Sequence, residues 1–273
     1  MKKTIQSTLR KLGLYYRVKS SLAYDLYWRM ADPRLIQGQT REVNFFRQAL
    51  QGFRPGDLIF DIGANIGQKT GVFLRLGARV VAVDPDRSNQ EILRQSFHTW
   101  RLRRRPVTIV GMAVSDNLGT HTMWVDAPGS AKNTLNPKWV DTLRTDAQRF
   151  GTTLQFAQEL EVETTTLEEM FRIHGRPFYI KIDVEGHEPA VLKGLQSAVP
   201  YISFEVNLPE FKPEAVQCVE LLNNLAPQGQ FNFAADCARG FVSQQWLPKI
   251  EFLGALDSCV EPCIEVFWSA HRS

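Results

Sequence analysis

Residues 58–67 constrain the fold of this chain more than any other stretch. The segment starts with the apolar run 58–60, continues through the acid Asp61, and ends in a turn that contains Gly63 and Gly67. The residues after this turn place apolar side chains at helical spacing. A strand that runs through a glycine-rich turn into a helix is typical of α/β proteins that hold a nucleotide-like ligand at the end of a parallel sheet.

The rest of the sequence repeats this alternation of buried strand and helix. Five such alternations predict an α/β fold with a doubly wound, mostly parallel sheet and right-handed crossovers. The expected strands are 58–60, 79–84, 107–114, 119–125, 161–164, 178–183, 201–206, 231–235 and 263–268. The expected helices include 40–50, 86–100, 137–150, 189–194 and 213–225.

Bulk properties indicate an ordinary globular protein. The chain has 273 residues, of which 44% are hydrophobic and 22% charged, and its net charge of +3 is too small to imply nucleic acid. The four cysteines lack the paired spacing of a zinc site, and they favour a reduced, cytoplasmic protein. No apolar run is long enough to predict a membrane-spanning helix.

The first forty residues differ from the rest, and we expect them to form a basic helical arm before one domain at 41–273. Within 1–30, apolar residues recur at helical spacing among many lysines and arginines. One interpretation is peripheral contact with an anionic membrane. The other is an arm that covers the domain or joins two copies in a homodimer. The domain is expected to carry an insert around 126–151.

The glycine turn distinguishes between two ligand classes. A nicotinamide dehydrogenase would show G-x-G-x-x-G, whereas this chain has Asp61-x-Gly63-x-Asn65-x-Gly67. An acid at the first position would lie close to a pyrophosphate, but it suits the cationic S-adenosylmethionine. The pattern therefore favours methyl transfer over hydride transfer, with an NAD-dependent oxidoreductase or a non-catalytic binding module as the alternatives.

A second group of polar residues follows the expected strand 178–183. Asp183, Glu185, His187 and Glu188 come within six positions of one another, at the same edge of the sheet as the glycine turn. His187 has the ordinary pKa best suited to a general base, and Asp183 or Glu185 are alternatives. The competing interpretation is that His187 only orders the turn.

Side chains with oxygen atoms at neighbouring strand ends also suggest a metal site as an interpretation. Asp183, together with Glu205 and Asn207 after the expected strand 201–206, offers oxygen atoms of the kind that Mg²⁺ accepts. A purely structural role for Glu205, as the partner of a nearby cation, is the alternative.

Five blocks of the sequence, spread over residues 57–206, resemble the FkbM-type methyltransferases. They read FDIGANIGQKTGVF, VVAVDPD, AVSDNLGT, TTTLEEM and FYIKIDVEGHEPAVLKGL, and their order and spacing match the family. The resemblance implies a class I Rossmann-like sheet of about seven strands, with the last one antiparallel. It also implies S-adenosylmethionine as donor, S-adenosylhomocysteine as product, and methylation of a hydroxyl on a sugar, glycoconjugate or secondary metabolite.

The resemblance also assigns residues to the donor. It places the methionine end against Asp61, Gly63 and Asn65, with Ala64 and Gly67 in the same turn, and the ribose against Asp84, where relatives often have glutamate. The adenine is expected beside residues 113–116, and in particular Ala113, Ser115 and Asp116. The small-molecule or glycan acceptor is not implied, because the arm and the insert fall outside the shared motifs.

Overall fold

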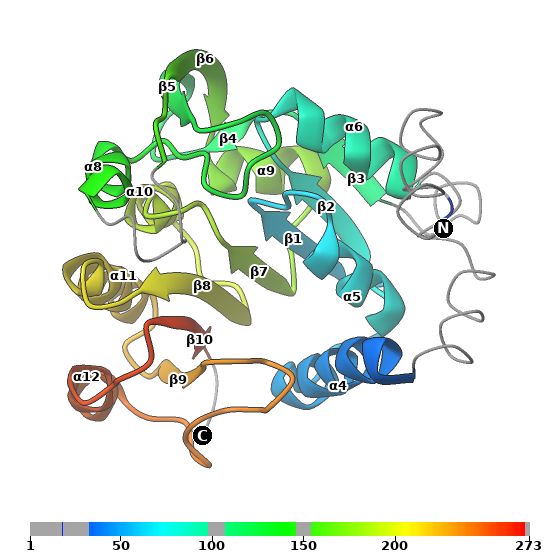
Figure 1. Ribbon diagram of the computed structural model, residues 1–273. Helices are drawn as coiled ribbons and strands as arrows, with labels where there is room; N and C mark the ends of the chain where they lie inside the picture. The colour runs from blue at the N-terminus through cyan, green and yellow to red at the C-terminus, as the bar shows by residue number, and fades with distance from the viewer. Residues whose placement is uncertain (1–17, 19–32, 98–106, 146–153, 271–273) are drawn as a thin grey trace.

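Seven described strands form a central sheet in which the apolar runs of the sequence lie side by side (Figure 1). Their order is β3-β2-β1-β7-β8-β10-β9. β10 pairs antiparallel with β8 and β9, and the remaining pairs are parallel, which confirms the predicted antiparallel last strand. The strands are β1 (Leu58–Ile62), β2 (Arg79–Val83), β3 (Val107–Val110), β7 (Tyr179–Ile182), β8 (Tyr201–Asn207), β9 (Gln230–Ala234) and β10 (Cys263–Ser269).

The structure is a computed structural model, and it describes Val18 and residues 33–97, 107–145 and 154–270. The expected basic arm, apart from Val18 and residues 33–40, lies outside the described residues, as does the arginine-rich segment 101–105. None of the helices in the described part of the chain has the length and apolar character needed to cross a membrane.

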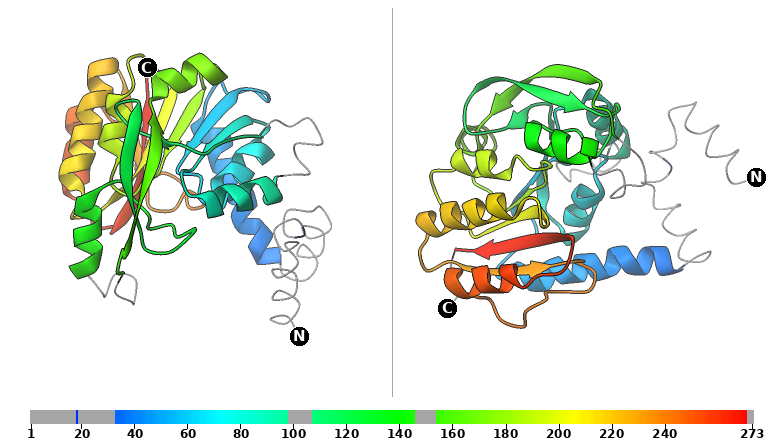
Figure 2. Two further views of the ribbon diagram at one scale, coloured as in Figure 1. Left: turned by 90° about the horizontal axis from the view of Figure 1, so that it is seen from above. Right: turned by 60° about the vertical axis from the view of Figure 1, so that its left-hand side comes forward.

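Helices cover both faces of the central sheet, which confirms the doubly wound arrangement (Figure 2). On one face, apolar side chains of α4, α5 and α6 form one buried cluster with Ile59 of β1. On the other face, side chains of α9, α10, α11 and α12 form a second cluster with its neighbour Phe60. Both side chains are fully buried, as expected for a strand covered on both sides. The helices are α4 (Pro33–Ala49), α5 (Gln68–Leu76), α6 (Arg87–Ser96), α8 (Pro137–Thr145), α9 (Leu167–His174), α10 (Glu188–Lys193), α11 (Lys212–Leu225) and α12 (Lys249–Asp257).

The carboxyl ends of β1, β2, β7 and β8 lie level along one edge of the sheet. Ile62 at the end of β1 is paired with Val83 of β2 and with Ile182 of β7, and Ile182 is paired with Phe204 of β8. The turns that follow these strands are therefore neighbours. In open α/β sheets this edge is where ligands bind.

A second, three-stranded sheet was not predicted. It has the order β4-β6-β5 and is formed by β4 (Ala113–Val114), β5 (Gly119–Val125) and β6 (Gln158–Thr165). The predicted single strand 107–114 is wrong, because the chain leaves the central sheet after Val110 and pairs with β6 from Ala113. Gly111 permits this departure: a Cβ there would lie 2.7 Å from the side chain of Gln90 on α6.

Helix α4 begins earlier than predicted. The sequence predicted a helix from residue 40, but one helix runs from Pro33 to Ala49. Proline is tolerated in the first turn of a helix, and an interior glycine costs only about 1 kcal/mol. Of the other helices, α12 was not predicted, and α8 is described only to Thr145 of the expected 137–150.

Candidate functional site

A cavity of about 260 Å³ lies at the carboxyl edge of the central sheet. Its walls come from the turns after β1, β2 and β7, from β4 and β5 of the second sheet, and from the loop 130–135. Predicted site residues that line it are Gly63, Asn65, Asp84, Ala113, Asp183, Glu185, His187 and Glu205. Predicted site residues that do not line it are Asp61, Ala64, Gly67, Ser115, Asp116 and Asn207.

The turn after β1 passes unusually close to the end of β7. Gly63 has a φ of 79°, and a Cβ built on it would lie 1.7 Å from the backbone oxygen of Asp183. No residue but glycine fits this contact. Asn65, the next cavity residue in the turn, also has a positive φ, of 47°. The glycine of the motif therefore joins the donor side of the predicted site to the side that carries the acids.

Asp84 fixes this turn from the end of β2. One carboxylate oxygen accepts a hydrogen bond from the backbone N–H of Asn65 at 2.8 Å. The other accepts from the backbone N–H of Asp86 at 2.9 Å and from the side chain of Asn89 at 3.2 Å. Burial raises the pKa of Asp84 to about 6, and these hydrogen bonds oppose the rise. Asp84 lines the cavity, where the sequence predicted a ribose ligand.

Asp61, the acid of the motif, does not line the cavity but lies behind the residues that do. Its side chain is 1% exposed, and one oxygen accepts a hydrogen bond from Thr70 of α5 at 2.5 Å. Burial raises its pKa, and the nearby Lys181 opposes this shift. The structure thus gives no geometric support to the expected contact between this carboxylate and the donor. Asp61 instead ties β1 to the helix that follows the turn.

The turn after β7 is held by an acid from the helix that follows it. Glu185 has a φ of 53° and Gly186 a φ of 93°. Glu188, the first residue of α10, accepts hydrogen bonds from the backbone N–H groups of Val184 at 3.0 Å and Gly186 at 3.3 Å. Burial raises the pKa of Glu188 to about 8. Its role is to shape the turn, because it does not line the cavity.

The loop 130–136 closes one side of the cavity and is fastened to the same turn. The buried Thr134 donates a hydrogen bond to the backbone oxygen of Glu185 at 2.8 Å, and Asn136 donates to that of Gly186. At its other end, the loop is joined to Asp86, which accepts from the side chain of Asn133 at 2.9 Å. The sequence placed this loop within the expected insert around 126–151, but it gave no sign of these anchors.

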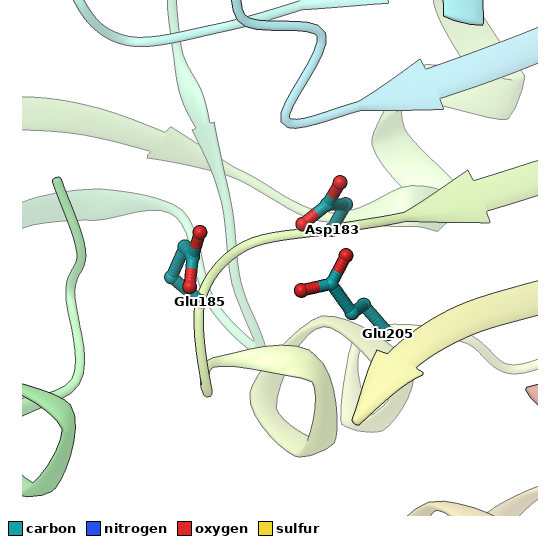
Figure 3. A group of neighbouring side chains, drawn as sticks. All are labelled: Asp183, Glu185 and Glu205. Atoms are coloured by element: carbon teal, nitrogen blue, oxygen red, sulfur yellow. The ribbon is translucent and has the colours of Figure 1, made fainter. Parts of the chain in front are cut away.

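Three acids meet on the side of the cavity opposite Asp84, and we call Asp183, Glu185 and Glu205 the acid cluster (Figure 3). Each offers one oxygen that lies within 4.8 Å of the other two. Lys181 donates to Asp183 at 2.6 Å, and Lys132 lies 3.2 Å from Glu185. Burial raises the pKa of Glu185 well above its ordinary value, with Lys132 opposing the shift. Burial and the charge of Asp183 raise the pKa of Glu205.

Asn207, the third predicted metal ligand, lies outside the cavity. Its side chain donates a hydrogen bond to Glu205 at 3.4 Å. Among the described acids, Glu185 joins Asp183 and Glu205 of the predicted set, and a metal contact of Asn207 stays a prediction. Alternation along β8 places Glu205 and Asn207 on one face, but only Glu205 is level with the end of β7.

His187 lines the cavity, and its ring Nε2 lies 3.0 Å from the hydroxyl of Ser115. The centre of the His121 ring is 6.2 Å away. Burial, and then the charge of His121, lower the pKa of His187 to about 4. The ring is therefore neutral near pH 7, and it is a weaker base than its ordinary pKa suggested. Ser115 was expected beside the adenine, but it is fully buried and holds this histidine, whereas Asp116 is exposed.

Several lining residues were not identified from the sequence. Asn89 on α6 and Met123 on β5 depend on long-range packing, so no local pattern could reveal them. Lys181 does not line the cavity, but its pairing with Asp183 had a visible signal: it is the one charged residue in an otherwise apolar strand. A buried lysine requires a carboxylate partner, and Asp183 is two residues away.

A family model described as the methyltransferase FkbM domain matches residues 61–236, which cover the central strands and the cavity. Among curated proteins, no sequence matches this chain.

Solved structures with a similar chain trace include several methyltransferases. The C-terminal domain of precorrin-6Y C5,15-methyltransferase from Rhodobacter capsulatus is 12% identical, with a TM-score of 0.42 over 82% of this chain and 85% of that one. An O-methyltransferase from Bacillus cereus, in complex with SAH, is 13% identical, with a TM-score of 0.38 over 86% and 80%. Likenesses this distant carry no information about the substrate.

Proposed function

We propose that this chain, which belongs to the FkbM-domain methyltransferase family, transfers a methyl group from S-adenosylmethionine to a hydroxyl oxygen. The acceptor class that we infer is a sugar, a glycoconjugate or a secondary metabolite. The observation that carries the proposal is the arrangement of the cavity, with Asp84 and the glycine turn on one side and the acid cluster on the other.

S-adenosylmethionine is the methyl donor of this enzyme, as of its family. We place the ribose at Asp84, whose carboxylate lines the cavity and can accept further hydrogen bonds from hydroxyl groups. We place the methionine end along Gly63 and Asn65, where the missing side chain of Gly63 exposes the backbone. Asp61 would act on the donor only indirectly, by holding this turn. Apolar contacts to the adenine would come from Ala113 and its neighbours in β4.

The acid cluster supports an alcohol as acceptor. An alcohol oxygen is a poor nucleophile until its proton is removed, and carboxylates on the acceptor side can accept that proton. A general base works best when its pKa is near the ambient pH. Burial raises the pKa of Glu185 from its acidic ordinary value, whereas it lowers the pKa of His187 to about 4, away from the ambient pH. We therefore assign proton removal to the acid cluster and the orientation of the turn to His187.

Alignment of the three reacting atoms would supply much of the rate. Methyl transfer requires the acceptor oxygen, methyl carbon and sulfur to lie in line, and positioning of reactants can contribute about 7–11 kcal/mol to catalysis. The loop 130–136 supports this role, because its hydrogen bonds to the turn after β7 and to Asp86 span the two sides of the cavity.

The test is a methyl-transfer assay with a radiolabelled donor and a panel of hydroxylated acceptors. We expect label to appear in an ether that resists mild acid and base. Label found only on nitrogen or carbon acceptors would contradict the oxygen assignment. Tight binding of S-adenosylhomocysteine without turnover on any acceptor would instead favour a binding module.

A further inference from the structure

We propose that the acid cluster, Asp183, Glu185 and Glu205, binds one divalent metal ion such as Mg²⁺ or Mn²⁺. The three side chains come from the ends of the adjacent strands β7 and β8 and from the turn after β7, and their carboxylates face a common space (Figure 3). Octahedral Mg²⁺ binds oxygen at about 2.0–2.1 Å, so its ligand atoms lie about 3–4 Å apart. Oxygens that all lie within 4.8 Å of one another need only small side-chain movements to reach this geometry.

Glu185 provides a second, independent indication of a missing partner. Its side chain is only 8% exposed. One of its oxygens pairs with Lys132, but the other, Oε2, is buried and has no hydrogen-bond partner among the described residues. A buried carboxylate oxygen without a partner is costly, and a bound ion is one kind of ligand that satisfies such an atom. A metal ion shared with Asp183 and Glu205 would supply it.

The charges around the cluster favour a cation over a water molecule alone. Three carboxylates meet two ammonium groups, Lys181 on Asp183 and Lys132 on Glu185. Glu205 accepts from the uncharged Asn207 and Cys263. The buried Asp61 also interacts with Lys181, so that this ammonium group offsets two acids rather than one. An ion with two positive charges, bound at the cavity wall, would compensate this excess of negative charge.

An ion at this position would contact the acceptor rather than the donor. Metal coordination would lower the pKa of a bound hydroxyl and hold it in place for attack, and a carboxylate oxygen of the cluster that is not bound to the ion would accept the proton. This consequence rests on the proposed function, whereas binding of the ion does not. The two can therefore be tested separately.

The test is titration of the full chain, first stripped with a chelator, with Mn²⁺. Loss of the free-ion electron paramagnetic resonance signal and calorimetry give the stoichiometry and affinity. We expect one ion per chain, and an affinity reduced at least about tenfold in Glu205→Gln and in Glu185→Gln. Glu261→Gln, which changes an exposed acid just before β10, should bind as the wild type does. Lys132→Met should bind more tightly, because it removes a positive charge 3.2 Å from a ligand.

The absence of saturable binding would overturn the proposal, and so would binding that survives unchanged in both Glu205→Gln and Glu185→Gln. Denaturation curves of each variant establish that it is folded. S-adenosylhomocysteine affinity is measured on the same samples. If the wild type binds Mn²⁺ but no S-adenosylhomocysteine, the ion site stands and the proposed function fails.

Discussion

Gly63 is the residue at which the two sides of the site touch. The backbone oxygen of Asp183 occupies the space where any other side chain would begin. Local sequence identifies this glycine as part of a turn, but the reason for it is a contact with a strand far along the chain. The carboxyl ends of β1 and β7 can be brought together only because this position has no Cβ.

Gly63→Ala should therefore destabilise the fold as well as the site. The added Cβ would overlap the Asp183 oxygen, and the φ of 79° is unfavourable for alanine. We expect a loss of at least about 1–3 kcal/mol in the free energy of unfolding, measured by denaturant titration. Gly254→Ala is the matched control, because Gly254 lies in α12 and a Cβ added there would meet nothing within 4 Å. It should gain up to about 1 kcal/mol, and equal effects at the two positions would contradict this account.

Glu188 links the shape of the turn after β7 to pH. Its pKa rises from 4.5 to about 8 because the side chain is buried, so the folded protein retains a proton that the unfolded chain releases. The stabilisation associated with this proton is complete below pH 4.5 and is lost as the pH rises through 8.

Glu188→Gln should remove this pH dependence and keep the acceptor oxygen for Val184 and Gly186. We expect the difference in unfolding free energy between Glu188→Gln and the wild type to shift in favour of the variant between pH 4.5 and 8. Denaturant titrations across this range measure it. Glu251→Gln, at an exposed position on α12, should show a flat difference. A flat difference for Glu188→Gln as well would mean that Glu188 is ionised in the folded protein.

Residue type and order predicted part of the site. Asp84, Asp183 and Glu205 follow or end strands that pair in parallel, so their meeting at one edge could be expected. Glu185 could not be placed, because a positive φ decides where its side chain points. The donor contact of Asp61 stays a prediction: its position in the motif suggested it, and the structure shows a buried side chain with one oxygen bonded to Thr70.

At the scale of elements, the loop 130–136 behaves as part of the turn after β7. Thr134 is 1% exposed, donates to the backbone oxygen of Glu185 and accepts from the backbone N–H of Asn136 at 2.9 Å. The first bond joins the loop to the turn after β7, and the second joins two residues within the loop. Both lie at the wall of the cavity.

Thr134→Val should loosen this loop. The substitution keeps the shape of the side chain but leaves two backbone groups without partners, the buried oxygen of Glu185 and the half-buried N–H of Asn136, at a cost of about 1–3 kcal/mol. Hydrogen exchange should become faster at 130–136 and 184–186 and stay unchanged in β9 and β10. Thr142→Val, which removes an exposed hydroxyl bond within α8, is the control and should leave exchange at the cavity unaltered. Uniform acceleration in both variants would show that the loop has no special coupling to the site.

Element prediction succeeded where the signal was local and failed where it was not. The strands of the central sheet are apolar runs between turns, and the glycine turn with α5 follows from residues close in sequence. The split of 107–114 into β3 and β4 depends on pairing with β6, about fifty positions away, so a continuous apolar run could not reveal it. The same pairing creates the second sheet that walls the cavity.

At the scale of the whole molecule, the sheet topology makes one site from residues spread between Gly63 and Glu205. Parallel strands β1, β2, β7 and β8 end together, helices bury both faces, and the second sheet closes the side of the cavity. The donor side and the acid side are thus fixed by the same strands. The family match spans this entire region, which is why the donor can be assigned while the acceptor is a proposal.

Calorimetric titration with S-adenosylhomocysteine tests the central claim most directly, because it asks whether this cavity holds the donor at Asp84. We predict one site per chain, an affinity at least about tenfold weaker in Asp84→Asn, and no change in Asp141→Asn, an exposed acid on α8 that does not line the cavity. Denaturation curves of both variants separate loss of binding from loss of folding. Equal weakening in the two variants, or no binding by the folded wild type, would contradict the account.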